Sequence, residues 1–502
     1  MKTEQFLSHH GVASNPFAEE DAQTDLVFQT HCADVYHPAW DKVYGDPANP
    51  ATSLVFGEKG AGKTAMRLQI VTKLAEHNRD HKAGRVWVVE YDDFNPMLDR
   101  FADRLSARKQ RDPSRVLADW KLWDHMDAIL SLAVTDLVDH LLDAKKSPKE
   151  DANRLKPSAT ESTPAKALDH AQKRDLLLLA ACYDNSTAEP LTSRWGRLRR
   201  RLGFYSPKSY MQLAIGVAVT LLVAWVGYQW GSRAWLERPW VYLVVLAGWA
   251  PWLLKYTTRV GRAWRISREL RVINRDVRAL GSLLRAFTKQ DLLNQPLPEK
   301  SRTDDRYEQL DKLRGVLATL GVTGVVVLVD RVDEPHQVNG RVELMRDFIW
   351  SMLDNKFLKQ SGLGIKLLLP AELMDHLNRE GRDFHQRARL DKQNVVPSLD
   401  WTGQALLDLA DARLAACAEG GKRPRLRDLV DPAVSDQRLV DAIRSLRTPR
   451  HAFKFLYRLI STHCNAHSES EPVWRVAPDA FEAMLAVYAR EQAAVDRGLS
   501  AS

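Results

Sequence analysis

The sequence has few cysteines and lacks the local patterns that cysteine-based sites need. Its four cysteines, Cys32, Cys182, Cys417 and Cys464, lie far apart, and none forms a C-x-x-C pair. We therefore expect neither a disulfide framework nor a zinc site, and a reducing cytoplasm is compatible with this usage. The first ten residues contain no apolar run, so we expect no cleaved signal peptide.

Other absences narrow the classes of function. We find no N-K-x-D base-reading motif and no separate nuclease, protease or transport constellation. The chain has 502 residues and 45% apolar content, which is ordinary for a folded protein and indicates two or three structural units. Its net charge of +8 is compatible with nucleic acid or a membrane as a partner, so the basic residues must first be located.

A glycine-rich stretch from Gly57 to Thr64 is the most specific motif in the chain. It fits the pattern G-x-x-x-x-G-K-[ST] and lies between an apolar run, 53–56, and an expected helix, 65–75. In this pattern backbone N–H groups point at phosphates, Lys63 reaches the β- and γ-phosphates, and the Thr64 hydroxyl binds Mg²⁺. The N-terminus of the helix adds positive potential. The predicted nucleotide-binding residues are Gly57, Glu58, Lys59, Gly60, Ala61, Gly62, Lys63, Thr64 and Ala65.

A second chemical motif spans residues 325–334, where a β-branched run ends in acidic residues. The run 325–329 predicts a buried strand that delivers carboxylates to its C-terminal edge. We expect Asp330 to hold Mg²⁺ and either Asp333 or Glu334 to orient an attacking water molecule. The runs 85–91, 365–369 and 393–399 are expected to supply further strands of a parallel sheet.

Two uncharged stretches lie between these motifs. The first, 209–232, includes an apolar run long enough to cross a hydrocarbon core of about 30 Å, and the second, 239–254, is shorter. Basic residues flank the pair on both sides: Arg194, Arg197, Arg199, Arg200, Arg201 and Lys208 precede it, and Lys255, Arg259, Arg262, Arg265, Arg268 and Arg271 follow. This pattern predicts a transmembrane hairpin with both ends in the cytoplasm. A buried hairpin with a basic nucleic-acid surface is the alternative.

The remaining segments complete the predicted organisation. We expect an irregular lead-in, 1–52, that folds against the nucleotide domain, a helix at 120–143, a flexible linker near 145–163, and a helix at 266–293. The predicted units are residues 1–96 (lead-in and first half of the core), 97–208 (helical insertion), 209–258 (hairpin), 259–320 (basic helix returning to the core), 321–400 (second half of the core) and 401–502 (helical lid). Pro449 and Arg450 open a lid helix, which would leave Arg450 free to face a phosphate.

This arrangement resembles the KAP-type P-loop NTPases, in which transmembrane helices are inserted between the two nucleotide motifs. The resemblance covers roughly residues 15–465. Asp330 and Asp333 match acidic positions of the family, whereas Arg331 stands where it often has an acid. Thr448-Pro449-Arg450 is similar to the N-P-R motif of its helical region. Some relatives are bacterial and associated with defence against phage.

We therefore predict an α/β P-loop ATPase of the additional-strand class, with a helical insertion, a two-helix membrane hairpin and a C-terminal helical lid. The expected cofactors are ATP and Mg²⁺. We favour ATP over GTP only because of the predicted class of NTPase. The expected catalytic residues are Lys63, Asp333, Glu334 and Arg450, and the metal ligands are Thr64 and Asp330. The expected location is the bacterial inner membrane, with the core in the cytoplasm.

At the membrane, nucleotide state would be coupled to assembly or signalling, through a homo-oligomer or other proteins. Two other functions are compatible with the same residues. One is a soluble AAA-like ATPase that acts on nucleic acid through the arginine clusters. The other is a nucleotide-binding switch that scaffolds partners and hydrolyses little.

Overall fold

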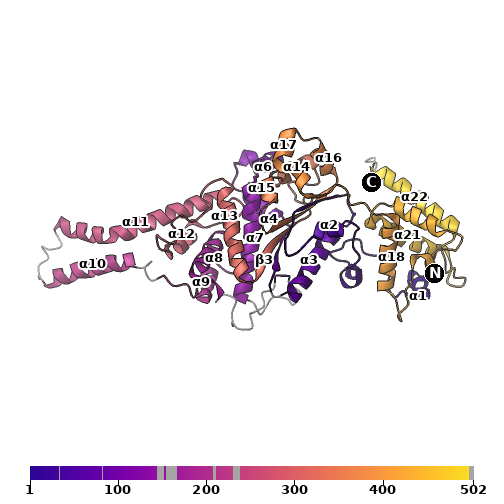
Figure 1. The fold of residues 1–502 in the computed structure, drawn as a ribbon, viewed down its shortest axis with the longest axis horizontal. Coiled ribbons are helices and arrows are strands. Elements are labelled where there is room, and N and C mark those ends of the chain that lie inside the picture. The colour runs from indigo at the N-terminus through magenta and orange to yellow at the C-terminus, as the bar shows by residue number, and fades with distance from the viewer. Residues whose placement is uncertain are drawn as a thin grey trace.

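The computed structural model describes residues 1–32, 34–81, 83–143, 152–153, 167–206, 211–229 and 238–496. Over these residues the protein is mostly helical and contains a parallel five-stranded sheet, which confirms the expected α/β class (Figure 1). The strands are β1 (Ser53–Gly57), β2 (Arg85–Tyr91), β3 (Val322–Val329), β4 (Leu363–Pro370) and β5 (Asn394–Val396). Their order is β2-β3-β4-β1-β5, so β4 separates the strand before the glycine-rich loop from the strand that ends at Asp330.

Helices cover both faces of the sheet, which explains why its strands are apolar runs. Along β3, Val326 and Leu328 face one side, and Val325, Val327 and Val329 face the other. Helices α2 (Trp40–Tyr44) and α3 (Lys63–Asp80) cover the first face. Helices α7 (Leu122–Asp143), α13 (Asp304–Thr319) and α14 (Val342–Ile349) cover the second. A parallel sheet buried on both faces favours apolar residues along its strands, and Lys366 of β4 is a buried exception.

The helical insertion shares one continuous apolar core with the second face of the sheet. Its expected long helix is confirmed as α7, and its other helices are α4 (Asn95–Ala102), α5 (Ala107–Gln110), α6 (Pro113–Asp119), α8 (His170–Tyr183), α9 (Leu191–Leu202) and α12 (Val277–Arg285). A fully buried ion pair, Asp127 to Arg306 at 2.9 Å, joins α7 to α13. The elements after β3 are α14, η5 (Trp350–Met352), α15 (Asn355–Leu358), α16 (Glu372–Asn378), α17 (Arg382–Ala388) and η6 (Leu390–Lys392).

One local expectation about the insertion was wrong, and another falls almost entirely on residues that the structure does not describe. In the expected linker 145–163 only residues 152–153 lie within the described part of the chain, and both are buried. Asn153 accepts a hydrogen bond from Val88 N and donates one to Val88 O, each at 2.7 Å, so it satisfies backbone groups of the edge strand β2. The expected helix 266–293 is interrupted, because residues 270–273 turn into the core and Asp276 caps α12 by accepting from Ala279 N.

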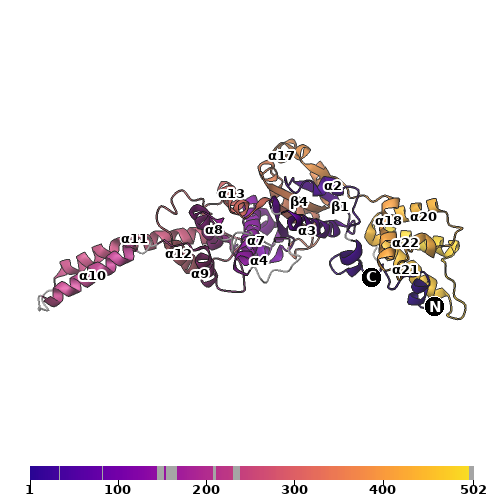
Figure 2. The ribbon, with the colours of Figure 1, turned by 60° about the horizontal axis from the view of Figure 1, so that its bottom comes forward.

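A helical arm projects from the insertion, formed by α10 (Met211–Gln229) and α11 (Pro239–Glu269), which lie side by side in both views (Figures 1 and 2). The two helices approach closely at their glycines. A Cβ at Gly216 would lie 2.9 Å from the Trp249 ring, and one at Gly248 would lie 2.8 Å from Val219. Trp249 also donates to Thr220 Oγ1 across the pair at 2.9 Å.

The expectation of two spanning helices is met by one helix only. Within the described residues, α10 alone is long and apolar enough to cross a membrane, and only 6% of its apolar window is buried. Helix α11 does not qualify, because its uncharged stretch ends at Leu254 and includes two prolines and several tryptophans. The helix continues through Pro251 to Glu269. The connecting residues 230–237 and the start of the first stretch, 209–210, lie outside the described residues.

The C-terminal helices form a second apolar core at the end of the molecule opposite the arm (Figure 2). They are α18 (Gly403–Ala416), α19 (Leu426–Leu429), α20 (Asp436–Ser445), α21 (Pro449–Ala466) and α22 (Pro478–Asp496). Phe6 and Leu7 of α1 (Thr3–His9) and the following Val12 and Phe17 belong to this core. The first part of the lead-in thus packs on the C-terminal helices rather than on the sheet, and the chain then passes through a π-helical turn, η1 (Phe28–Cys32).

Candidate functional site

The glycine-rich loop joins β1 to α3 at the C-terminal edge of the sheet. Gly60 and Gly62 have φ angles of +87° and +96°, a conformation that side chains rarely allow. A Cβ at Gly60 would also lie 2.7 Å from the Cβ of Arg450 on α21. The loop therefore needs glycine at this position for its own turn and for the approach of the C-terminal helices.

Lys63, the first residue of α3, folds its side chain back over the loop. Its Nζ donates to the carbonyl oxygens of Gly57 at 2.7 Å and Glu58 at 3.0 Å. Burial lowers the pKa of this ammonium group, while the nearby carboxylates of Asp330, Asp333 and Glu372 raise it. The lysine thus lies where acids from β3 and β4 converge on the loop.

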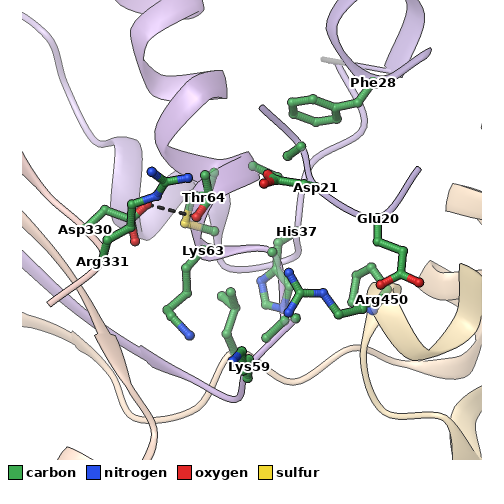
Figure 3. A pocket seen from close by; sticks show the side chains of 18 of the residues that line it. Glu20, Asp21, Phe28, His37, Lys59, Lys63, Thr64, Asp330, Arg331 and Arg450 are labelled. Carbon is green, nitrogen blue, oxygen red and sulfur yellow. Dashed lines mark hydrogen bonds between the residues drawn. The ribbon is translucent and has the colours of Figure 1, made fainter. Parts of the chain in front are cut away.

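The structure brings Thr64 and Asp330 together, although 266 residues separate them in the sequence. The Thr64 hydroxyl donates to Asp330 Oδ2 at 3.0 Å (Figure 3). Asp330 follows β3 directly and is only 1% exposed. Burial raises the pKa of its carboxyl group, and the cation of Arg67 is the strongest influence that opposes this rise.

Arg67 is a central residue that the sequence analysis missed. Its side chain is 3% exposed, and its Nη1 lies 2.5 Å from Glu90 Oε2 and 2.7 Å from Asp92 Oδ2. Its Nε lies 3.5 Å from Asp330 Oδ2. Arg67 follows Lys63 by four residues, so it extends the same face of α3 by one turn, and that spacing is the signal that could have identified it. The guanidinium group connects the carboxylates at the ends of β2 and β3.

The loop after Asp330 presents the two acids expected to act on water. Arg331 has a φ of +59°, which is unusual for a non-glycine residue, and its Nε lies 3.6 Å from Glu334 Oε1. The Glu334 side chain is 58% exposed, and partial burial raises the pKa of its carboxyl group while Arg331 lowers it. Asp333 interacts electrostatically with Lys63. Both acids line the cavity, and Asp333 is the one that acts on the lysine.

The C-terminal helices contribute to the site from the other side of the loop. Thr448 caps α21, Pro449 occupies its first turn as expected, and Arg450 follows with its backbone N–H 3.4 Å from Gly60 O. Arg450 reaches towards His37 and the loop lysines (Figure 3), and its buried Nε has no hydrogen-bond partner within the described part of the chain. Trp401 Nε1 donates to Ala61 O at 2.8 Å. No local pattern in the sequence indicates the Trp401 contact.

A cavity of about 350 Å³ extends from the loop between the lead-in and the C-terminal helices. At the far end from Asp330, Phe28 from the lead-in and Phe453 from α21 line it. Arg413 lies between these segments, donates to Pro16 O at 2.7 Å, and contacts Asp25 Oδ2 at 2.5 Å. The guanidinium group lies 4.4 Å from the centre of the Phe453 ring. Away from the glycine-rich loop, aromatic side chains thus line the cavity together with charged ones such as Glu20, Asp21 and Asp25.

The donor set fits a metal ion that a phosphate ligand would share. The described residues contain no cluster of three or more His, Cys, Asp or Glu side chains that could hold a metal alone. Thr64 and Asp330 offer one hydroxyl and one carboxylate, and Mg²⁺ is commonly bound by one or two protein oxygens together with substrate phosphates and water.

Every expected site residue lines the cavity except Gly57 and Glu58, which belong to the loop but do not line the cavity. Comparisons with protein-family models, curated proteins and solved structures found no match for this chain. Its function must therefore be argued from its own residues and their geometry.

Proposed function

We propose that this protein is a membrane-anchored P-loop ATPase that binds and hydrolyses Mg-ATP. The observation that carries the proposal is the hydrogen bond from Thr64 to Asp330, which joins a G-x-x-x-x-G-K-T loop to the acidic end of a buried strand. One strand, β4, lies between the two strands concerned, as the additional-strand class requires. In that class both motifs act on one phosphate chain and its metal ion.

The position of each residue indicates its role in binding or hydrolysis. The loop N–H groups and Lys63 would bind the β- and γ-phosphates, and Arg450 would contact the γ-phosphate from the C-terminal helices. Thr64 and Asp330 would hold Mg²⁺, which when bound neutralises charge that develops on the phosphate oxygens. Asp333 or Glu334 would accept a proton from the attacking water molecule. Phe28 and Phe453 would contact the base.

Steady-state hydrolysis by the purified full-length chain tests this proposal. We expect Mg²⁺-dependent release of phosphate from ATP, and we expect Asp330→Asn to reduce it by at least about tenfold because a metal ligand is lost. Tight ATP binding without turnover would instead favour the nucleotide-binding switch. Absence of both binding and turnover in folded protein would contradict the proposed activity.

The membrane anchor is proposed from the arm. A soluble core helix would be mostly buried, whereas α10 exposes large apolar side chains such as Leu221 (64% exposed), Leu222 (59%) and Trp225 (58%). Helix α11 exposes Leu243 (63%) and Leu246 (56%). Exposed apolar surface of this extent is typical of membrane or protein contact sites. The uncharged stretch of α11 would be about 24 Å long at a rise of about 1.5 Å per residue, and Lys255 could reach the interface by snorkelling.

Both ends of the arm return to the same body of the protein, so two crossings would keep the site in one compartment, which we propose is the bacterial cytoplasm. Cysteine labelling of intact cells tests this topology. The four native cysteines are buried and would contribute little background. A membrane-impermeant maleimide should label Ser232→Cys but not Ser193→Cys, which lies exposed on α9. Labelling of neither position, or extraction of the protein by carbonate without detergent, would contradict the anchor and favour the soluble ATPase that acts on nucleic acid.

Coupling of the nucleotide state to assembly or signalling at the membrane, through a homo-oligomer or other proteins, extends the proposal. A role in anti-phage defence extends it further, and its only support is the family resemblance. Pull-down in mild detergent, with and without ATP, tests the partners. A nucleotide-dependent change in the recovered proteins is the expected result, and an unchanged set would contradict the coupling.

A further inference from the structure

The base of the arm, where α11 leaves the body of the protein, carries a group of cations in an unusual setting. Leu253 and Leu254 are exposed, Lys255 follows them directly, and Arg259 lies one turn further along the helix. Helix α12 packs beside this part of α11 and ends at Arg285 (Figure 1). Lys255 lies within electrostatic reach of both Arg259 and Arg285.

The protein compensates the positive charge of Arg259 only in part. Arg259 is 6% exposed; its Nη2 donates to Thr288 O at 3.2 Å, and its Nε has no hydrogen-bond partner among the described residues. The acid that acts on Arg259 is Asp291, whose Oδ2 already accepts hydrogen bonds from Thr288 N and Thr288 Oγ1. Burial and the neighbouring Arg262 lower the pKa of Arg259. A mostly buried guanidinium group with so little compensation would be stabilised by the charge of a nearby anion.

Aromatic side chains mark the same level of the arm. Trp252 and Tyr256 stack at 5.6 Å between ring centres, and the Arg285 guanidinium group lies 4.9 Å from the centre of the Tyr256 ring. Tryptophan and tyrosine collect at the boundary between hydrocarbon and headgroups. The exposed Leu243 and Leu246 lie further out on α11, the stacked aromatics follow at 252–256, and Arg259 lies beyond them, so their order along the helix matches the layers of a bilayer.

We propose that Lys255, Arg259 and Arg285 form a binding site for the phosphate headgroup of an anionic phospholipid. The inference rests on the proposed membrane anchor and is independent of the ATPase activity. The lipid chains would lie along the exposed apolar face of α11, while the phosphate would accept from the cations of α11 and α12. The occupied site would fix α12, and with it the insertion, at a set distance from the membrane.

Lipid binding by the full-length protein in a neutral detergent tests this site. Native mass spectrometry should show that wild type binds phosphatidylglycerol in preference to phosphatidylcholine. Each cation near an anionic surface contributes on the order of 1 kcal/mol, so the double variant K255Q/R285Q should bind phosphatidylglycerol about 30-fold more weakly, or by about 2 kcal/mol. A matched control, R108Q/R111Q, removes two exposed arginines at α5, which packs against α6 at the sheet end, and should bind like wild type.

Three results would overturn the inference. One is equal binding of the two lipids by wild type, and another is an equal loss in the control variant. The third is full displacement of phosphatidylglycerol by millimolar inorganic phosphate, which would identify a site for free phosphate. ATP binding should be unchanged in K255Q/R285Q, and failure of wild type to insert into bilayers would refute the anchor itself rather than the headgroup site alone.

Discussion

Replacement of Arg67 by methionine is the substitution whose cost is easiest to work out from the structure. Methionine is apolar and fits the buried part of the site, but it leaves the carboxylates of Glu90, Asp92 and Asp330 without their shared cation. Removal of one partner from a buried ion pair typically costs about 3–5 kcal/mol. The Glu90 and Asp92 side chains are 46% and 22% exposed and can be rehydrated. We therefore expect about 2–3 kcal/mol.

Thermal unfolding, followed by tryptophan fluorescence in detergent, provides the assay. Since about 1 kcal/mol corresponds to roughly 2–4 °C in units of 150–250 residues, Arg67→Met should lower Tm by roughly 5–10 °C. Arg67→Lys retains the charge but cannot contact both strands with a planar fork, so its Tm should lie between those of wild type and Arg67→Met. Arg108→Met, which removes an exposed arginine on α5, is the control and should leave Tm within about 1–2 °C of wild type.

A double-mutant cycle with Asp92→Asn separates the ion pair from simple packing. Because Arg67 and Asp92 are in contact, the double variant should lose less Tm than the two single variants together. An additive loss, or an unchanged Tm in Arg67→Met, would refute the reasoning that this guanidinium group holds the ends of β2 and β3 together.

The remaining predictions concern the water-activating acid, the lid, the arm and pH. Asp333→Asn or Glu334→Gln should keep ATP binding and slow turnover by roughly tenfold or more, and wild-type turnover in both would place the base elsewhere. Arg450→Ala should remove the preference for ATP over ADP measured by calorimetry; equal affinities already in wild type would make Arg450 a structural residue. Gly216→Leu should separate α10 from α11 and expose the arm to protease, because a Cβ there would lie 2.9 Å from the Trp249 ring, whereas an unchanged digestion pattern would contradict the close packing. His125 is fully buried, and burial lowers the pKa of its imidazole to about 4. As the pH falls, the unfolded chain takes up this proton before the folded chain does. The free energy of unfolding should therefore fall by about 3 kcal/mol between pH 6.5 and 4. Urea titrations should show this loss of stability on acidification in wild type and a smaller loss in His125→Gln. Equal losses in the two proteins would exclude the His125 imidazole as the cause.

The parallel sheet and the loop could be predicted because both depend on short local patterns. The β-branched and aliphatic run at 325–329, and the run at 365–369 that Lys366 alone interrupts, are buried on both faces, as is typical of central parallel strands. The glycine spacing of the loop is fixed by backbone geometry at Gly60 and Gly62. Such signals need no knowledge of the rest of the chain.

The contacts that close the cavity could not be predicted, because they join segments far apart in the sequence. Arg413 contacts Pro16 and Asp25 across nearly 400 residues, and no local pattern in either segment indicates the other. The same holds for α1, whose Phe6 and Leu7 pack on C-terminal helices. Asn153 lies in a stretch with the composition of a flexible linker, and no local pattern there indicates that its amide pairs with the edge strand.

Binding of Mg-ATP to Lys63→Ala tests the central claim most directly. The ammonium group of Lys63 lies on the loop among the acids at the ends of β3 and β4, where it would contact the β- and γ-phosphates. Calorimetry on the full-length protein should show binding by wild type and at least about 100-fold weaker binding by the variant, with Tm unchanged. Unchanged affinity in a folded Lys63→Ala protein would contradict the account, because the glycine-rich loop would then have no part in nucleotide binding.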